Sequence, residues 1–177
     1  MKTVFQSCLT VLTLTVGCQV HRPADRIATS PGLEEFGSDA LRIRLSYPSR
    51  WSRASSDEYV LKLVSPAPGD ASISLDVPKL PPHVPGFIPL GLVVNGYIDD
   101  LKKQHAGVVV SDPASMKVAG ANARRVTSTW IDAGGQSRAE HAVLTVHGDR
   151  VYIFRANDPD EDALQASDKI LSSVKWE

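Results

Sequence analysis

Four segments of the chain are predicted as strands: residues 41–47, 59–65, 71–77 and 123–131. In the first, Leu41, Ile43, Leu45 and Tyr47 alternate with polar residues at the two-residue period of a half-buried strand. In the third, Ile73, Leu75 and Val77 share one face, and serines with Asp76 take the other. Pro66 to Asp70 has the composition of a hairpin connection between the second and third strands. A shorter strand is predicted at 108–111, and a turn at Gly120 to Asn122.

The clearest hairpin spans residues 136–157. A two-residue turn at Gly148-Asp149 would place His147 opposite Arg150. That register puts apolar residues on both faces at mid-strand: Leu144, Val146, Val151 and Ile153 on one, and Val143, Tyr152 and Phe154 on the other. Both faces of the hairpin must therefore be covered.

Two segments carry the three- and four-residue spacing of amphipathic helices. The first is 90–105, followed by Gly107, which suits a helix end. The second follows Asp158, predicted as the N-cap, with Pro159 at the first helical position and Glu161 completing a capping box. Its predicted buried stripe comprises Ala163, Leu164, Ser167, Ile170, Leu171 and Val174. Together these patterns predict an α+β domain over residues 40–177, in which an antiparallel β-sheet is sandwiched between helices.

Residues 78–89 hold five prolines, which excludes a central strand or a helix interior. Leu80, Val84, Phe87 and Ile88 are nevertheless apolar. The segment is either a long loop that packs these side chains over the core, or a contact surface for a partner or ligand.

The first seventeen residues are typical of a lipoprotein signal peptide. After Lys2, the mostly apolar run from Val4 to Val16 would span about 20 Å as a helix, short of a hydrocarbon core of about 30 Å. Gly17-Cys18 resembles a lipobox, in which a small residue precedes a cysteine that is acylated; Thr15 departs from the leucine usual at its position. The alternatives are an ordinary signal peptide cut nearby, or a cysteine that is not modified at all.

Residues 18–39 are polar and rich in proline and charge, which predicts a flexible tether. Acyl chains on Cys18, each methylene contributing about 0.8 kcal/mol when buried, would hold the protein on a membrane. The predicted location is the cell envelope, facing the periplasm or the exterior.

Composition removes several classes of function. The formal net charge is −1, and removal of residues 1–17 would take away one lysine and leave −2, so no basic excess points to nucleic acid. The two cysteines are Cys8 and Cys18, and Cys8 would leave with the signal peptide. The domain can therefore have neither a disulfide nor a cysteine zinc site.

The order of elements resembles the PsbP-like fold family, which includes the photosystem II protein PsbP, a nuclear import factor that binds the GTPase Ran, and small bacterial lipoproteins. The likeness covers residues 40–177 and rests on Leu45-Ser46-Tyr47-Pro48 with Trp51, Tyr97-Ile98 with Leu101, Ala119-Gly120-Ala121, and Ile170-Leu171-Ser172-Ser173. The resemblance implies a protein that acts by binding rather than catalysis. It does not transfer a partner, because partners within the family differ.

The chain offers few candidates for chemistry. Asp158, Asp160 and Asp162 have calcium-loop spacing, but Ala163 and Lys169 stand where glycine and glutamate belong, so capping explains them better. His141 and His147 share a strand face about 20 Å apart and cannot share a metal by themselves.

Other residues have structural explanations. Glu140 and Arg155 share a face one residue out of register, which predicts an ion pair, and Trp51 and Trp130 are expected in the core or at its rim. No catalytic or nucleotide-binding motif appears, and neither a cofactor nor a metal is predicted.

Three functions remain in competition. The first is a non-catalytic, membrane-anchored envelope lipoprotein with a domain that binds a protein partner of unknown identity. The second is a periplasmic carrier of a small molecule, with a cleft beneath the proline-rich segment. The third is a hydrolase in which His141 or His105 meets a serine and a carboxylate brought together by the fold.

Overall fold

The computed structural model describes residues 32–67, 69–79 and 88–177. The predicted signal peptide, Cys18 and residues 80–87 of the proline-rich segment lie outside the described residues.

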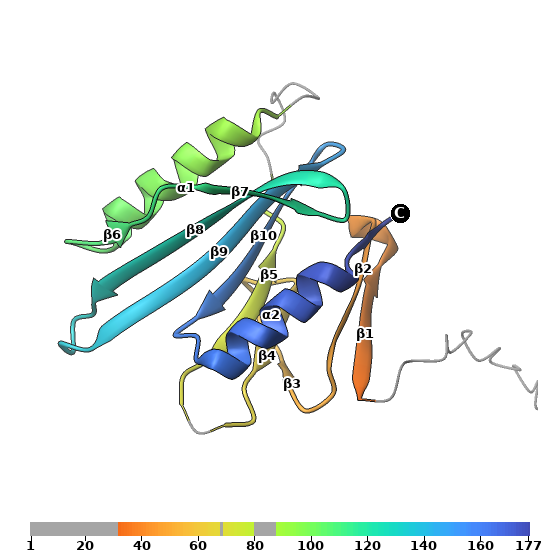
Figure 1. Cartoon of the computed structure of the whole chain (residues 1–177), viewed down its shortest axis with the longest axis horizontal. Coiled ribbons are helices and arrows are strands. Elements are labelled where there is room, and N and C mark those ends of the chain that lie inside the picture. Colours follow the sequence, from red (N-terminus) through yellow and green to blue (C-terminus); the bar gives the residue numbers. More distant parts are fainter. Residues whose placement is uncertain (1–31, 68, 80–87) are drawn as a thin grey trace, which may run out of the picture.

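An eight-stranded antiparallel sheet forms the centre of the domain (Figure 1). Its strand order is β3 (Ser52–Ala54), β4 (Leu61–Val64), β5 (Ser72–Asp76), β10 (Arg150–Asn157), β9 (Ser137–His147), β8 (Ala121–Ile131) and β6 (Val109–Val110), and β7 (Ala114–Val118) also pairs with β8. The strands predicted ahead of the last hairpin are present as β4, β5, β6 and β8 of this sheet and as β2 (Ile43–Pro48), which lies in a second sheet. The turn before β8 lies at Ala119-Gly120 rather than at the predicted Gly120 to Asn122. Ala119 and Gly120 both adopt positive φ, as a tight two-residue hairpin turn requires.

The β9–β10 hairpin has the predicted register. His147 pairs with Arg150, Leu144 with Ile153 and Val143 with Phe154. Its two faces belong to different cores: Val143, Tyr152 and Phe154 to one, and Leu144, Val151 and Ile153 to the other.

The two helices cover these two faces from opposite sides (Figure 1). Helix α1 (Leu90–Gln104) buries Val94 and Leu101 against one face, and helix α2 (Glu161–Ser173) buries Ala163, Ala166, Ile170 and Leu171 against the other. The fold class is therefore the predicted one, an antiparallel sheet between helices. Ala166 takes the central place expected for Leu164 and Ser167, which are only half-buried.

A second, three-stranded sheet in the order β1 (Leu33–Ser38), β2 (Ile43–Pro48) and β11 (Lys175–Trp176) packs on the α2 side. A 3₁₀ turn (Asp39–Leu41) joins β1 to β2. β1 falls inside the predicted tether, so the folded domain begins near Leu33 rather than near Ala40. The strand escaped prediction because Phe36 is its only fully buried side chain, and polar or small neighbours hide the alternation.

The N-cap of α2 is Asp160, not Asp158. The Asp160 carboxylate accepts a hydrogen bond from the Ala163 amide at 2.7 Å, as a capping side chain does at the third helical position. Asp158 has a φ of +43° and uses its carboxylate on Arg138 and the Ala139 amide instead. The helix therefore begins two residues later than the Pro159 signal predicts.

Candidate functional site

A groove of about 470 Å³ runs between α1 and the central sheet. Helix α1 contributes Tyr97 and Leu101 from its buried side, and His105 follows at its C-cap. The sheet contributes aromatic and polar side chains from four strands: Trp130 of β8, Glu140 of β9, Arg155 and Asn157 of β10, and Asp76 of β5. Glu58 and Tyr59, just before β4, also line the groove.

The floor of this groove is a buried ion pair. Arg155 Nε lies 3.7 Å from Glu140 Oε2, and Arg155 Nη1 lies 3.4 Å from Asp76 Oδ2. The side chains of Glu140 and Arg155 are only 9% and 17% exposed. The predicted pairing of Glu140 with Arg155 is thus present, but the pair is buried. Its offset is two residues, because Glu140 is opposite Asn157 and Arg155 is opposite Ala142.

Two tyrosine rings lie close to the arginine. The guanidinium carbon of Arg155 lies 5.6 Å from the centre of the Tyr97 ring and 5.8 Å from that of Tyr59, within cation–π range. The Tyr97 hydroxyl donates a hydrogen bond to Glu140. Burial, and then the charge of Glu140, raise the pKa of Tyr97 far above its usual value, so its hydroxyl remains a donor.

The charge of Arg155 is retained despite its burial. Burial alone lowers the pKa of Arg155, but the surrounding Tyr97, Glu140 and Asp76 outweigh that effect and raise it. Removal of this cation would leave the Glu140 carboxylate buried with the Tyr97 hydroxyl as its remaining hydrogen-bond partner among the described residues.

A stacked aromatic pair forms the far end of the groove. The rings of His105 and Trp130 lie 4.1 Å apart at an interplanar angle of 22°. Trp130 is half-buried, as expected for a rim position, whereas Trp51 is 1% exposed and belongs to the core. No sequence pattern predicted that His105 and Tyr59 line the same groove, since His105 was a candidate only for a hydrolase and Tyr59 was assigned only to a strand.

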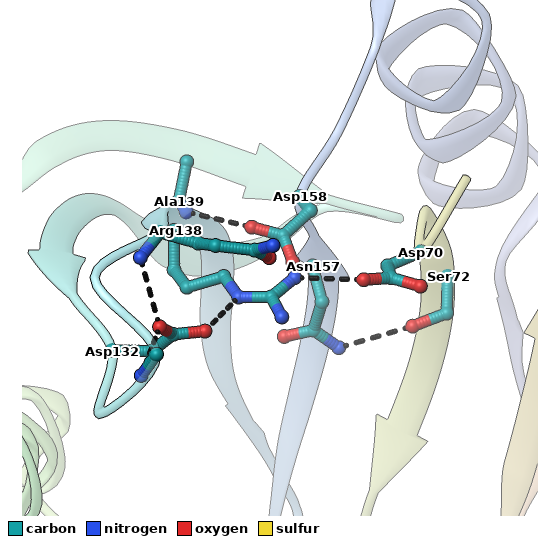
Figure 2. Close-up of polar contacts among 9 residues, drawn as sticks. Asp70, Ser72, Asp132, Arg138, Ala139, Asn157 and Asp158 are labelled. Atoms are coloured by element: carbon teal, nitrogen blue, oxygen red, sulfur yellow. Dashed lines mark hydrogen bonds and ion pairs between the residues drawn. The ribbon is translucent and has the colours of Figure 1, made fainter.

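On β9, two residues before Glu140, Arg138 forms ion pairs with three aspartates (Figure 2). Arg138 Nε lies 2.8 Å from Asp132, and its Nη1 lies 2.8 Å from Asp158 and 2.9 Å from Asp70. These carboxylates come from the β8–β9 turn, the β10–α2 junction and the β4–β5 connection. Hydrogen bonds from the Gln136 amide and from Arg138 lower the pKa of Asp132. Arg138 thus connects three loops at the end of the sheet where Asn157 borders the groove.

The convergence that a hydrolase would need is incomplete. His141 of β9 lines a small pocket of about 150 Å³ together with Ser167 and Asp168 of α2. Asp168, however, accepts a hydrogen bond from Arg125 at 2.9 Å, and within the described residues no hydrogen bond joins His141 to either side chain. His147 stacks on Trp176 at the other end of β9. In the same part of the chain, no group of three metal-ligating side chains is found, and no helix is long and apolar enough to cross a membrane.

No protein-family model matches the sequence, and no curated protein is significantly similar to it. Solved structures show the fold. Cyanobacterial PsbP (CyanoP) from Synechocystis aligns with a TM-score of 0.64 at 10% identity, over 85% of this chain and 95% of that one.

Two further structures are similar. The Ran-binding protein Mog1p of Saccharomyces cerevisiae aligns with a TM-score of 0.57 at 11% identity, over 81% of this chain and 95% of its own. LpqN of Mycobacterium tuberculosis, described as involved in cell envelope biogenesis, aligns with a TM-score of 0.55 at 20% identity, over 84% and 86%. The chain therefore has the PsbP-like fold that the sequence motifs indicated.

Proposed function

We propose that this chain is a non-catalytic, lipid-anchored accessory protein of the cell envelope whose domain binds a protein partner. The observation that carries the proposal is the groove between α1 and the sheet, where an ion pair, a hydrogen bond and cation–π contacts hold charged and aromatic side chains in place. The similar structures support it, since one is a Ran-binding protein and another takes part in cell envelope biogenesis.

The anchor in this proposal is Cys18. Fourteen peptide steps separate Cys18 from Gly32, where the described domain begins, so the connection can extend at most about 50 Å. An acylated Cys18 would therefore keep the domain within reach of membrane proteins on the same surface. Binding to such a neighbour would profit from the high effective concentration that a common surface provides.

Acylation can be tested on the cysteines themselves. Cys18→Ser should release the protein from membranes of an expressing bacterium and remove the acyl mass of the mature protein, as measured by fractionation and intact mass spectrometry. Cys8→Ser is the matched control, because Cys8 is predicted to leave with the signal peptide, and it should change neither result. If Cys18→Ser stayed on membranes with an unchanged mature mass, the anchor proposal would be wrong.

Partner binding can be tested by crosslinking from the groove. A photoreactive side chain at Gln104, an exposed residue on the groove rim, should form a discrete crosslinked species in intact envelopes. The same group at Gln165, an exposed residue of α2, should not form this species. Equal crosslinking patterns from the two positions would contradict a partner site at the groove.

A hollow at the start of α1 favours the carrier of small molecules as a second candidate. It measures about 710 Å³, and Ile88, Leu90, Met116 and Val146 contribute apolar surface to it. An anilinonaphthalene sulfonate dye should then bind, and Val146→Trp should block it, whereas Val64→Trp on β4, three strands away from β9, should not. Identical dye binding by both variants would exclude this hollow as the carrier site.

A further inference from the structure

We propose that the groove between α1 and the sheet receives a basic side chain, arginine or lysine, from an exposed segment of the partner protein. This inference rests on the proposed function, since it names the chemistry by which a protein partner would be recognised. Charge, unpartnered buried hydroxyls and aromatic walls each support it independently.

The charge of the groove favours a cation. Glu58, Asp76 and Glu140 supply three carboxylates, and Arg155 is the one arginine or lysine among the lining residues. Arg155 is already engaged by Asp76 and Glu140, so it offers little to an incoming anion. An added ammonium or guanidinium would offset the excess negative charge, and the partial burial of the site reduces screening by salt.

Two buried hydroxyl groups with unused hydrogen-bonding capacity lie next to the ion pair, at strand positions paired with its members. Ser74 and Ser128 are 2% and 1% exposed, and neither hydroxyl has a hydrogen-bond partner among the described residues. Ser74 lies directly across the β5–β10 pair from Arg155, and Ser128 lies across the β8–β9 pair from Glu140. Because side chains at directly paired positions project from the same face, both hydroxyls lie on the face of the sheet that carries the ion pair, one beside Arg155 and one beside Glu140.

Unsatisfied buried polar groups are costly, so native proteins seldom keep two beside one ion pair without a use. A hydroxyl can rotate and accept as well as donate a hydrogen bond. Ser74 and Ser128 can therefore adjust when Asp76 or Glu140 shifts part of its interaction from Arg155 to a second cation. The long separations of 3.4 and 3.7 Å within the ion pair leave room for such a redistribution.

The walls suit the long stem of a basic residue. The rings of Tyr59 and Tyr97 both lie within cation–π range of Arg155, and Trp130, which stacks on His105, adds a further aromatic surface to the lining. Aromatic faces attract cations and also pack against methylene groups. The volume of about 470 Å³ lies within the range of sites that bind small ligands, which is ample for one side chain.

The test uses the full chain and two short peptides that differ in one functional group. One peptide alternates glycine with arginine, and the other replaces each arginine by citrulline, a neutral side chain of nearly the same shape. Binding is followed by nuclear magnetic resonance, from the shift of the Trp130 indole N–H, which Trp130→Phe assigns. The arginine peptide should shift this signal and bind roughly tenfold more tightly than the citrulline peptide.

Two double variants separate the groove from general electrostatics. Glu58→Gln/Asp76→Asn should weaken binding of the arginine peptide by roughly tenfold. Glu35→Gln/Asp149→Asn removes the same charge from exposed residues elsewhere and should change the affinity less than about twofold. Asp149 directly precedes β10 and is six residues, or about 20 Å, from Arg155. Glu58→Gln alone, at an exposed position, covers the case in which the Asp76 change disturbs folding.

Equal binding of the two peptides, equal losses in the two double variants, or a Trp130 shift with an oligoglutamate peptide instead would each overturn the inference. These outcomes leave the proposed function intact if the Gln104 crosslink still forms. Loss of that crosslink with selective arginine binding retained would instead remove the protein-binding role and keep the cation site.

Discussion

The buried ion pair beneath the groove provides the sharpest test of the structure. Arg155→Met removes the guanidinium, which lies within cation–π range of the Tyr59 and Tyr97 rings, while keeping much of the aliphatic stem. The Glu140 carboxylate, 9% exposed, then keeps only the Tyr97 hydroxyl as a partner among the described residues. Glu140→Gln is the milder change, because its amide oxygen can still accept from Tyr97 and Arg155 still has Asp76.

The expected costs follow from this asymmetry. Breaking a buried pair by removing one partner usually costs about 3–5 kcal/mol, and the lower end applies here because Tyr97 still supports Glu140. We expect about 3 kcal/mol for Arg155→Met and about 1.5 kcal/mol for Glu140→Gln. The double variant leaves no uncompensated charge on Glu140 and should cost about 2.5 kcal/mol, so the coupling between the two positions is about 2 kcal/mol.

Urea unfolding followed by circular dichroism measures these free energies, provided that the transitions are two-state with unchanged slopes. For a domain of this size, the loss expected for Arg155→Met corresponds to a fall in Tm of about 10 °C. A cost below about 1 kcal/mol for Arg155→Met, or a double variant equal to the sum of the single ones, would show that the pair is not coupled as described.

Three further changes test other parts of the fold. Asp160→Ala should cost about 1 kcal/mol in urea unfolding and Asp160→Asn much less, because asparagine also caps; equal losses would exclude the cap. Leu144→Ala, at a residue with no exposed surface, should cost about 3 kcal/mol, whereas Leu92→Ala, 68% exposed, should stay within about 0.5 kcal/mol; comparable losses would contradict the burial pattern. Burial, and then Arg125, lower the pKa of His141, so folded His141 binds fewer protons than unfolded His141 and stability should decline as the pH falls below about 6.5. His141→Gln should flatten that decline between about pH 8 and pH 5, and an unchanged pH profile would refute its origin in His141.

The sequence predicted the fold correctly in the segments that hold many apolar residues. The β9–β10 register followed from a two-residue turn at Gly148-Asp149, and the apolar character of both strand faces required a cover on each side. The elements that escaped are short edge strands. β1, β3, β7 and β11 bury few side chains of their own, and their pairing partners are set by tertiary contacts that no local pattern records.

The N-terminus of α2 shows how a tertiary contact can override a helix-start signal in the sequence. Asp158-Pro159 has the composition of a helix start, yet Asp158 is taken by Arg138 from a strand twenty residues earlier. The charge-assisted hydrogen bond to half-buried Arg138 engages the Asp158 carboxylate in place of a cap, and Asp160 caps the helix instead. The pairing of Arg138 with Asp70, Asp132 and Asp158 could not be predicted, because it joins three turns whose spatial arrangement depends on the whole sheet.

The groove itself follows from a change in polarity across one face of the sheet. On the α1 side, β9 and β10 present Leu144 and Ile153, while β5 presents Ser72, Ser74 and Asp76 to the same side. Helix α1 packs mainly on β8 and β9, and so covers the apolar part of this face. Glu140 and Arg155 lie where the covered part ends, which leaves them buried enough to be held rigidly and open enough to border a hollow. The alternation in β5 and the apolar faces of the hairpin were both visible in the sequence, but only the position of α1 across the strands turns their boundary into a site.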